Sequence, residues 1–149
     1  MSTGRQKFPS LYQTIAANDD GLEGHAYIAD GGLDVLTSDP LNDQPGTNPE
    51  QLLGLALSTC LNATLAAIEK RDGLPHTSQV HTRVEFARDY RGFQFYVTAQ
   101  VIIPGVEVST AQQMVDLAER RCPVAKLLSG NANVQIVLVD HIDFTTSTV

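Results

Sequence analysis

A long apolar stretch from residue 48 to residue 71 constrains the fold of this chain more than any other feature. Asn48 is a good N-cap, Pro49 suits the first helical position, and Asp72 and Gly73 supply a stop, so we predict one long helix. Its apolar residues lie on nearly every face, which is typical of a helix that is buried on several sides. A single 149-residue chain with few other helices covers such a helix poorly, so we expect a symmetric partner to cover the rest.

Strand-like segments flank this helix on both sides. We predict three strands before it and a hairpin after it, over residues 10–17, 24–30, 33–38, 78–90 and 93–103. We then expect a helix from about residue 110 to Arg121 with Ser109 as its cap, a second short helix from Pro123, and a strand over residues 131–139. The order βββαββααβ is that of an α+β fold with a central buried helix, because no βαβ unit repeats.

Length and composition indicate an ordinary globular protein. The apolar fraction is 42% and the charged fraction is 18%, so we expect one domain over residues 1–149, with residues 1–9 and 141–149 as flexible or peripheral tails. The net charge is −7 and no basic cluster exceeds Arg120-Arg121, which argues against nucleic-acid and anionic-membrane partners. We see no signal peptide and no uninterrupted apolar run of the ~18 residues that a membrane span needs, so we expect a cytoplasmic protein.

The chain has only two cysteines, and each lies beside a helix signal. Cys60 is in the middle of the long apolar helix, and Cys122 is at a break between a charged turn and Pro123. In a reducing compartment such thiols stay free unless chemistry oxidises them. The four histidines, His25, His76, His81 and His141, lack the spacing of a zinc site, and we expect neither a metal nor a cofactor.

Three motifs together resemble the OsmC/Ohr family of thiol-dependent peroxidases. They are Gly46-Thr47-Asn48-Pro49-Glu50-Gln51-Leu52-Leu53, Ser58-Thr59-Cys60 and Cys122-Pro123-Val124. The resemblance covers about residues 10–140, and the Pro104-Gly105-Val106 turn is closer to the OsmC branch than to the Ohr branch. It implies an intertwined homodimer, with two long helices packed in its centre.

The resemblance also implies a redox cycle for oxidative-stress defence. Cys60 would be the peroxidatic thiol and Cys122 the resolving thiol, with organic hydroperoxides or hydrogen peroxide as substrates. A thiolate that attacks a peroxide becomes a sulfenic acid, and a second thiol converts it to a disulfide before further oxidation. A dithiol reductant such as a lipoylated protein would then regenerate the pair.

This chain departs from the family at the cation that activates the peroxidatic sulfur. In the family, an arginine held by the glutamate that corresponds to Glu50 lies over that sulfur. It falls either between the first two strands or just before the Gly-Thr-Asn-Pro segment. Residues 18–24 hold no arginine and residues 31–45 hold neither arginine nor lysine, so His25 is the nearest cationic candidate. We therefore expect slow turnover unless an arginine from an unexpected segment enters the site.

Each of these residues also has a simpler interpretation. Cys60 can be a small core residue, Cys122 an ordinary loop cysteine, and Glu50 a carboxylate that complements the helix dipole. Besides the peroxidase, two alternatives stay open: a redox sensor with weak or no peroxidase activity, and a dimeric module that binds a small acyl or aromatic ligand. Glu50 and Cys60 are ten residues apart, or ~15 Å along one helix. We therefore expect Glu50 to serve Cys60 of the partner subunit, with the central helices antiparallel.

Overall fold

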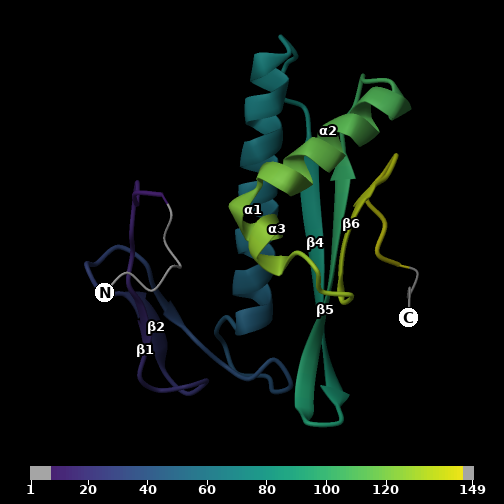
Figure 1. Cartoon of the computed structure of the whole chain (residues 1–149). Coiled ribbons are helices and arrows are strands. Elements are labelled where there is room, and N and C mark those ends of the chain that lie inside the picture. Colours follow the sequence, from purple (N-terminus) through teal and green to yellow (C-terminus); the bar gives the residue numbers. More distant parts are fainter. Residues whose placement is uncertain (1–7, 146–149) are drawn as a thin grey trace. The chain divides into compact units, whose positions relative to one another are not determined.

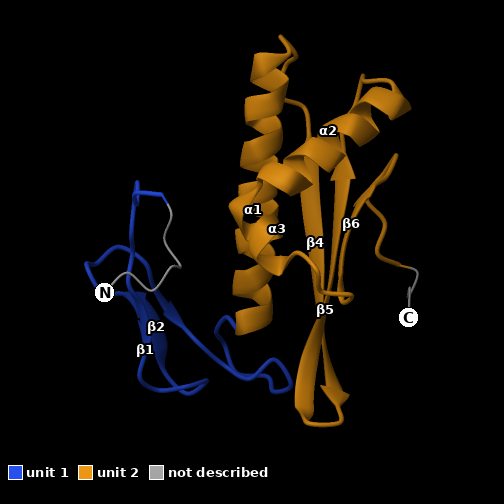
Figure 2. Ribbon diagram, in the orientation of Figure 1, with its two compact units in different colours: residues 1–48 blue, residues 49–149 orange. Residues whose placement is uncertain are grey.

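A computed structural model describes residues 8–145, and its elements follow the order that the sequence predicts, βββαββααβ. The α+β class is thereby confirmed (Figure 1). The chain divides into two units, residues 1–48 and residues 49–149 (Figure 2). The expectation of a single domain over residues 1–149 stays a prediction, and the predicted tails lie partly outside the described residues.

The first unit holds a three-stranded antiparallel sheet in the order β1-β2-β3. Its strands are β1 (Ala16–Asn18), β2 (His25–Ile28) and β3 (Asp34–Leu36). The Asn18 side chain accepts hydrogen bonds from the backbone N–H of Asp20 and Gly21, at 3.0 and 2.6 Å, and so stabilises the turn that follows β1. The predicted first strand over residues 10–17 is wrong for most of its length. Residues 10–15 are exposed and lie outside β1, so their apolar pattern does not reflect burial against a sheet, although the Ile15 carbonyl accepts a hydrogen bond from the Ala29 N–H at 2.9 Å.

The central helix of the second unit is α1 (Pro49–Arg71), as predicted. It ends where Gly73 adopts a φ of 72°, a left-handed conformation that glycine adopts without strain. The Leu74 N–H then donates to the Glu69 carbonyl at 2.8 Å, which closes the last turn. By length and hydropathy alone α1 is a candidate membrane span, a test that the core helices of globular proteins also pass. Its packing against β4, β5, α2 and α3 is that of a core helix.

The second sheet has the order β4-β5-β6. The hairpin of β4 (Gln79–Asp89) and β5 (Gly92–Ile102) matches the predicted one closely. The chain then crosses through α2 (Val108–Arg121) and α3 (Pro123–Leu128) and returns as β6 (Val134–Leu138), which pairs with β5 in parallel. The predicted cap of α2 is wrong, because Glu107 takes the N-cap position and the Ser109 hydroxyl donates to its carboxylate at 3.1 Å.

A single apolar core joins α1 to this sheet and to the crossover helices. Leu57, Leu61, Leu65 and Ile68 of α1 are at most 1% exposed. They pack with alternate residues of β5 and with the inner face of α2, namely Val97, Ala99, Val101, Ala111, Met114, Val115 and Ala118. Alternation along β5 places one set of side chains toward the helices, as a sheet covered on one face requires. This core fixes the positions of both cysteines.

Candidate active site

Cys60 lies at the middle of α1 and is half-buried. It packs against the apolar core, and its carbonyl accepts a hydrogen bond from the Thr64 hydroxyl at 2.9 Å. The neighbouring turns of the helix present Leu57 and Leu61 to the core. The thiol is therefore held at the edge of the core, where solvent still reaches it in part.

Cys122 lies at the junction of α2 and α3 and is fully buried. Its N–H donates to the Ala118 carbonyl at 2.7 Å, and its sulfur accepts a long hydrogen bond from the Ala125 N–H at 3.5 Å. Pro123 follows at the first position of α3, where its missing N–H costs nothing. The sequence break at Cys122-Pro123 is thus the corner that turns the crossover toward α1.

The structure brings the two thiols together within one unit of one chain. Burial is the main cause that raises the pKa of Cys122, and a hydrogen bond and the charge of the neighbouring Cys60 raise it further. Cys122 is therefore held as a neutral thiol beside a more accessible one. This asymmetry suits a pair in which Cys60 reacts first and Cys122 second. Their roles stay predictions.

Glu50 lies in the first turn of α1, ten residues before Cys60. Its Oε2 atom is buried and has no hydrogen-bond partner among the described residues. The side chain lines a cavity of about 370 Å³ whose other walls come from α1 and β4, namely Gln51, Gly54, Leu55, Ser58, Thr82 and Val84. Neither cysteine lines this cavity, so the structure does not bring Glu50 to the thiols of its own chain.

His25, the expected nearest cation, already has a carboxylate partner. Its Nδ1 lies 2.8 Å from Oδ1 of Asp34 across β2 and β3, and this contact raises the pKa of His25. Two arginines of the second unit also have acidic neighbours: Arg71 pairs with Asp72 at 2.8 Å and Arg83 lies 3.5 Å from Glu85. Within residues 8–145 no group of three or more histidines, cysteines or carboxylates is arranged to hold a metal ion.

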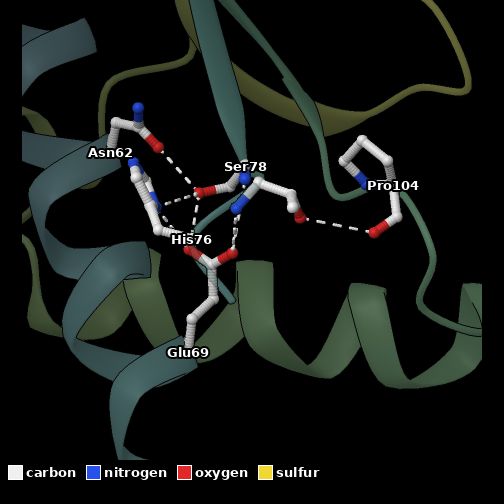
Figure 3. A network of polar contacts seen from close by, with 6 residues as sticks. Asn62, Glu69, His76, Ser78 and Pro104 are labelled. Atoms are coloured by element: carbon white, nitrogen blue, oxygen red, sulfur yellow. Dashed lines mark hydrogen bonds and ion pairs between the residues drawn. The ribbon is translucent and has the colours of Figure 1, made fainter. Parts of the chain in front are cut away.

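The C-terminal end of α1 carries a polar network that the sequence did not predict. Glu69 is 1% exposed, and its carboxylate accepts hydrogen bonds from the Thr77 N–H at 2.9 Å, the Ser78 N–H at 3.3 Å and the Ser78 hydroxyl at 2.8 Å (Figure 3). His76 Nδ1 lies 2.9 Å away, and Asn62 Oδ1 lies 2.8 Å from the Ser78 hydroxyl. A sequence signal existed, because Asn62 and Glu69 are two helical turns apart on one face of the helix, with Leu65 between them.

This network contains serine, histidine and glutamate but lacks the arrangement of a hydrolytic triad. Both Ser78 and Glu69 approach the same ring nitrogen, Nδ1 of His76, so the ring cannot pass a proton from one to the other. Ser78 is also only 4% exposed. The network instead ties the C-terminal end of α1 to the start of β4.

Comparison with known proteins agrees with this architecture. The family described as OsmC-like protein matches residues 41–137. A curated relative, the organic hydroperoxide resistance protein of Xanthomonas axonopodis pv. citri, is 30% identical over 134 residues, which are 86% of this chain and 94% of the relative.

Two solved structures are similar over almost the whole chain. A protein from Lactobacillus casei, provisionally described as a redox protein, is 54% identical with a TM-score of 0.86, over 93% of this chain and 97% of that one. The organic hydroperoxide resistance protein OhrB of Bacillus subtilis is 29% identical with a TM-score of 0.79, over 87% and 100%. The assignment to the OsmC branch stays a prediction. The family match, the curated relative and the shared fold together place this chain in the OsmC/Ohr family.

Proposed function

We propose that this protein is a thiol-dependent peroxidase that reduces organic hydroperoxides, and hydrogen peroxide as a further substrate. One observation carries the proposal: a half-buried Cys60 adjoins a fully buried Cys122 whose pKa burial raises. The names of the relatives, organic hydroperoxide resistance proteins, support a role of the family in peroxide resistance. That role points to oxidative-stress defence, and we place it in the cytoplasm.

The cycle has three balanced steps. The Cys60 thiolate attacks the terminal peroxide oxygen and the O–O bond breaks, so that Cys60 becomes a sulfenic acid. The alkoxide takes a proton from water and leaves as the alcohol. The Cys122 thiol then attacks that sulfur, and water leaves as the Cys60–Cys122 disulfide forms. A dithiol, for which a lipoylated protein is a suitable class, then exchanges with this disulfide. Cys60 and Cys122 return to thiols, and the dithiol is oxidised to a disulfide.

In the proposed active site, the Glu50 side chain beside Cys60 would come from a second copy of the chain. The exposed face of α1 consists of small and apolar residues, with Leu55 64% exposed and Ala56, Thr59, Ala63 and Ala67 also exposed. Such a face favours close packing against a partner helix. Leu55 is midway between Glu50 and Cys60, so two antiparallel α1 helices that cross at Leu55 would place each Glu50 level with Cys60 of the partner subunit.

The decisive experiment is peroxide consumption with a dithiol reductant, compared between the wild type and two cysteine variants. We expect Cys60→Ser to abolish turnover and Cys122→Ser to allow one oxidation, after which Cys60 proceeds to sulfinic acid. Mass spectrometry of the oxidised wild type should find one intramolecular disulfide per chain. If both thiols stay free after oxidant treatment, the peroxidase proposal fails.

A second candidate function, binding of a small apolar ligand, rests on another cavity. It has a volume of about 720 Å³, within the usual range for ligand sites, and lies beside the N-terminal end of α2. Ile103, Val106 and Leu138 are among its apolar walls, and His81 and His141 contribute polar groups. Ligand binding that persists in the double variant Cys60→Ser/Cys122→Ser, without peroxide turnover in the wild type, would favour this function. A redox sensor would instead show slow stoichiometric oxidation of the wild type.

A further inference from the structure

The buried carboxylate oxygen of Glu50 lacks a hydrogen-bond donor within residues 8–145. A buried carboxylate without a donor or a cation is costly, because it loses hydration and gains nothing in return. The adjoining cavity of about 370 Å³ has room for a further side chain, and its other walls are mainly apolar or small. This end of α1 therefore has a place for a cation.

Among the arginines of the described second unit, Arg88 is the best suited to fill that place. Arg71 and Arg83 have acidic neighbours, and Arg120 and Arg121 lie in the last turn of α2. Arg91 lies in the turn beyond β4, further from Glu50 along the strand direction than Arg88. Within the described residues, Arg88 pairs with no carboxylate, and its guanidinium carbon stacks 5.2 Å from the centre of the Phe93 ring. A cation–π contact of an exposed arginine is weak, so this side chain is easily moved.

Arg88 projects from the face of β4 that α1 covers. Side chains alternate along a strand, so Arg88 shares a face with Thr82 and Val84, two walls of the Glu50 cavity. Its cross-strand partner in the hairpin is Phe93. The stacked pair Phe86 and Phe93, with ring centres 4.7 Å apart, lies on the same face between Val84 and the hairpin tip.

The helix and the strand run in opposite directions, so Glu50 and Arg88 lie toward the same end of the second unit. Ser78 contacts Asn62, and Thr82 contacts Ser58 at 2.8 Å. A side chain at Gly54 would lie 3.5 Å from Val84. Figure 1 shows the N-terminal end of α1 and the β4–β5 tip at the same end.

The separation is within the reach of an arginine side chain. From the level of Gly54 and Val84, Glu50 is four helical residues away, or ~6 Å, and Arg88 is four strand residues away, or ~13 Å. The offset along the axis is therefore ~7 Å, and the arginine and glutamate side chains extend toward each other across it.

We propose that Arg88 leaves the Phe93 ring, enters the cavity and pairs with Glu50, and thereby supplies the positioning cation that the loop before β2 lacks. This proposal rests on the proposed peroxidase function, in which Glu50 lies beside Cys60 of the partner subunit. Arg88 and Glu50 act as one unit: the carboxylate fixes the guanidinium, and the guanidinium stabilises the Cys60 thiolate and the peroxide oxygen that it attacks.

The test measures how fast iodoacetamide alkylates Cys60 at several pH values, in the Cys122→Ser background. We expect Arg88→Gln to slow alkylation near neutral pH by ~10-fold and to move the rate–pH profile to higher pH, because a nearby positive charge favours the thiolate. Arg88→Lys should retain most of the rate. Arg91→Gln, which removes a neighbouring arginine at the same hairpin tip, should change the rate less than ~2-fold.

A double-mutant cycle separates a pair from two independent residues. Glu50→Gln should slow alkylation about as much as Arg88→Gln, and the double variant should be no slower than either, since both remove one unit. Equal rates in Arg88→Gln and Arg91→Gln, or additive losses in the double variant, would overturn the proposal. Circular dichroism of each variant checks that its fold is intact, and Arg88→Lys remains informative if Arg88→Gln does not fold.

The outcome is independent of whether the wild type turns over peroxide. A wild type without turnover, in which Arg88→Gln still slows alkylation, would refute the peroxidase and retain the Arg88–Glu50 pair. A wild type with turnover, in which Arg88→Gln alkylates normally, would refute the pair and retain the peroxidase.

Discussion

The two ends of α1 each carry a glutamate with buried carboxylate oxygen, and the two carboxylates have opposite surroundings. Near the C-terminal end, Glu69 accepts hydrogen bonds from Thr77 and Ser78 and lies beside His76 (Figure 3). At the N-terminal end, Glu50 has a buried oxygen without a donor among the described residues and faces a cavity. The carboxylate of Glu69, with its hydrogen bonds, stabilises the framework. The carboxylate of Glu50 has the surroundings that we propose for a site that binds a further group.

The largest difference should appear in the free energy of unfolding after each glutamate is removed. Glu69→Ala leaves the backbone N–H groups of Thr77 and Ser78 without their acceptor, and we expect a loss of ~3–5 kcal/mol. Glu50→Ala removes no hydrogen bond that the structure contains, and we expect a change of less than ~1 kcal/mol. Urea unfolding followed by circular dichroism measures both. Equal losses at the two ends would contradict the comparison.

Ser78 tests the same network from the side of the donor. Its hydroxyl lies 2.8 Å from both Glu69 and Asn62, so Ser78→Ala removes one donor and leaves both acceptors underused. We expect a loss of ~1–3 kcal/mol in the free energy of unfolding. Ser58→Ala is the matched control at the open end, where the hydroxyl has, among residues 8–145, a single partner, Thr82, at 2.8 Å. We expect Ser58→Ala to lower the free energy of unfolding by ~1 kcal/mol. A larger loss in Ser58→Ala than in Ser78→Ala would contradict the assignment of the stabilising network to the C-terminal end of α1.

The acid side of the stability profile should depend on Glu69. Burial alone would raise the pKa of Glu69, but the hydrogen bonds from His76, Thr77 and Ser78 outweigh it and hold the pKa below its usual value. A lowered pKa contributes stability that is fully present above the unfolded-state value of ~4.3 and is lost as the pH falls through the folded-state value. We expect Glu69→Gln to lose less stability than the wild type between about pH 5 and pH 3, by ~1–2 kcal/mol. The measurement is urea unfolding of both proteins at several pH values. The same loss of free energy of unfolding in the wild type and in Glu69→Gln would contradict this role of Glu69.

The smallest expected effect concerns Gly54, in the wall of the open cavity. An alanine side chain there meets Val84 at 3.5 Å, an ordinary contact, and alanine is preferred over glycine inside a helix. We expect Gly54→Ala to raise the free energy of unfolding by ~0.5–1 kcal/mol while it narrows the cavity beside Glu50. A gain in melting temperature with slower peroxide turnover would show that this end of α1 is shaped for function and not for stability.

The sequence predicts those elements whose signals are local. The bounds of α1 follow from Pro49 at its start and Gly73 after its end, and the β4–β5 hairpin follows from alternation on both sides of Gly92. The prediction of a strand over residues 10–15 is wrong because their short apolar pattern is the same whether or not a partner strand exists. The parallel pairing of β6 with β5 has no local signal, because it depends on the crossover through α2 and α3.

The site divides in the same way. The motifs identified Cys60, Cys122 and Glu50 as candidates, and helix geometry separated Glu50 from Cys60. The Glu69 network escaped because its donors lie eight and nine residues further along the chain, beyond a turn. Arg88, which we propose as a further site residue, has no sequence signal, because it is distant from α1 in the sequence and only the course of β4 brings it back toward the start of the helix.

The position of Cys122 at the corner between α2 and α3 has a consequence for the energetics of the whole second unit. A disulfide to Cys60 would close a loop of about 60 residues and restrict the unfolded chain, with an expected gain of ~4 kcal/mol. For a chain of this length, such a gain corresponds to a rise of roughly 10 °C in melting temperature. In each catalytic cycle the protein would thus alternate between a less stable dithiol form and a more stable disulfide form. A thermal melt would then report what fraction of the protein is in the disulfide form.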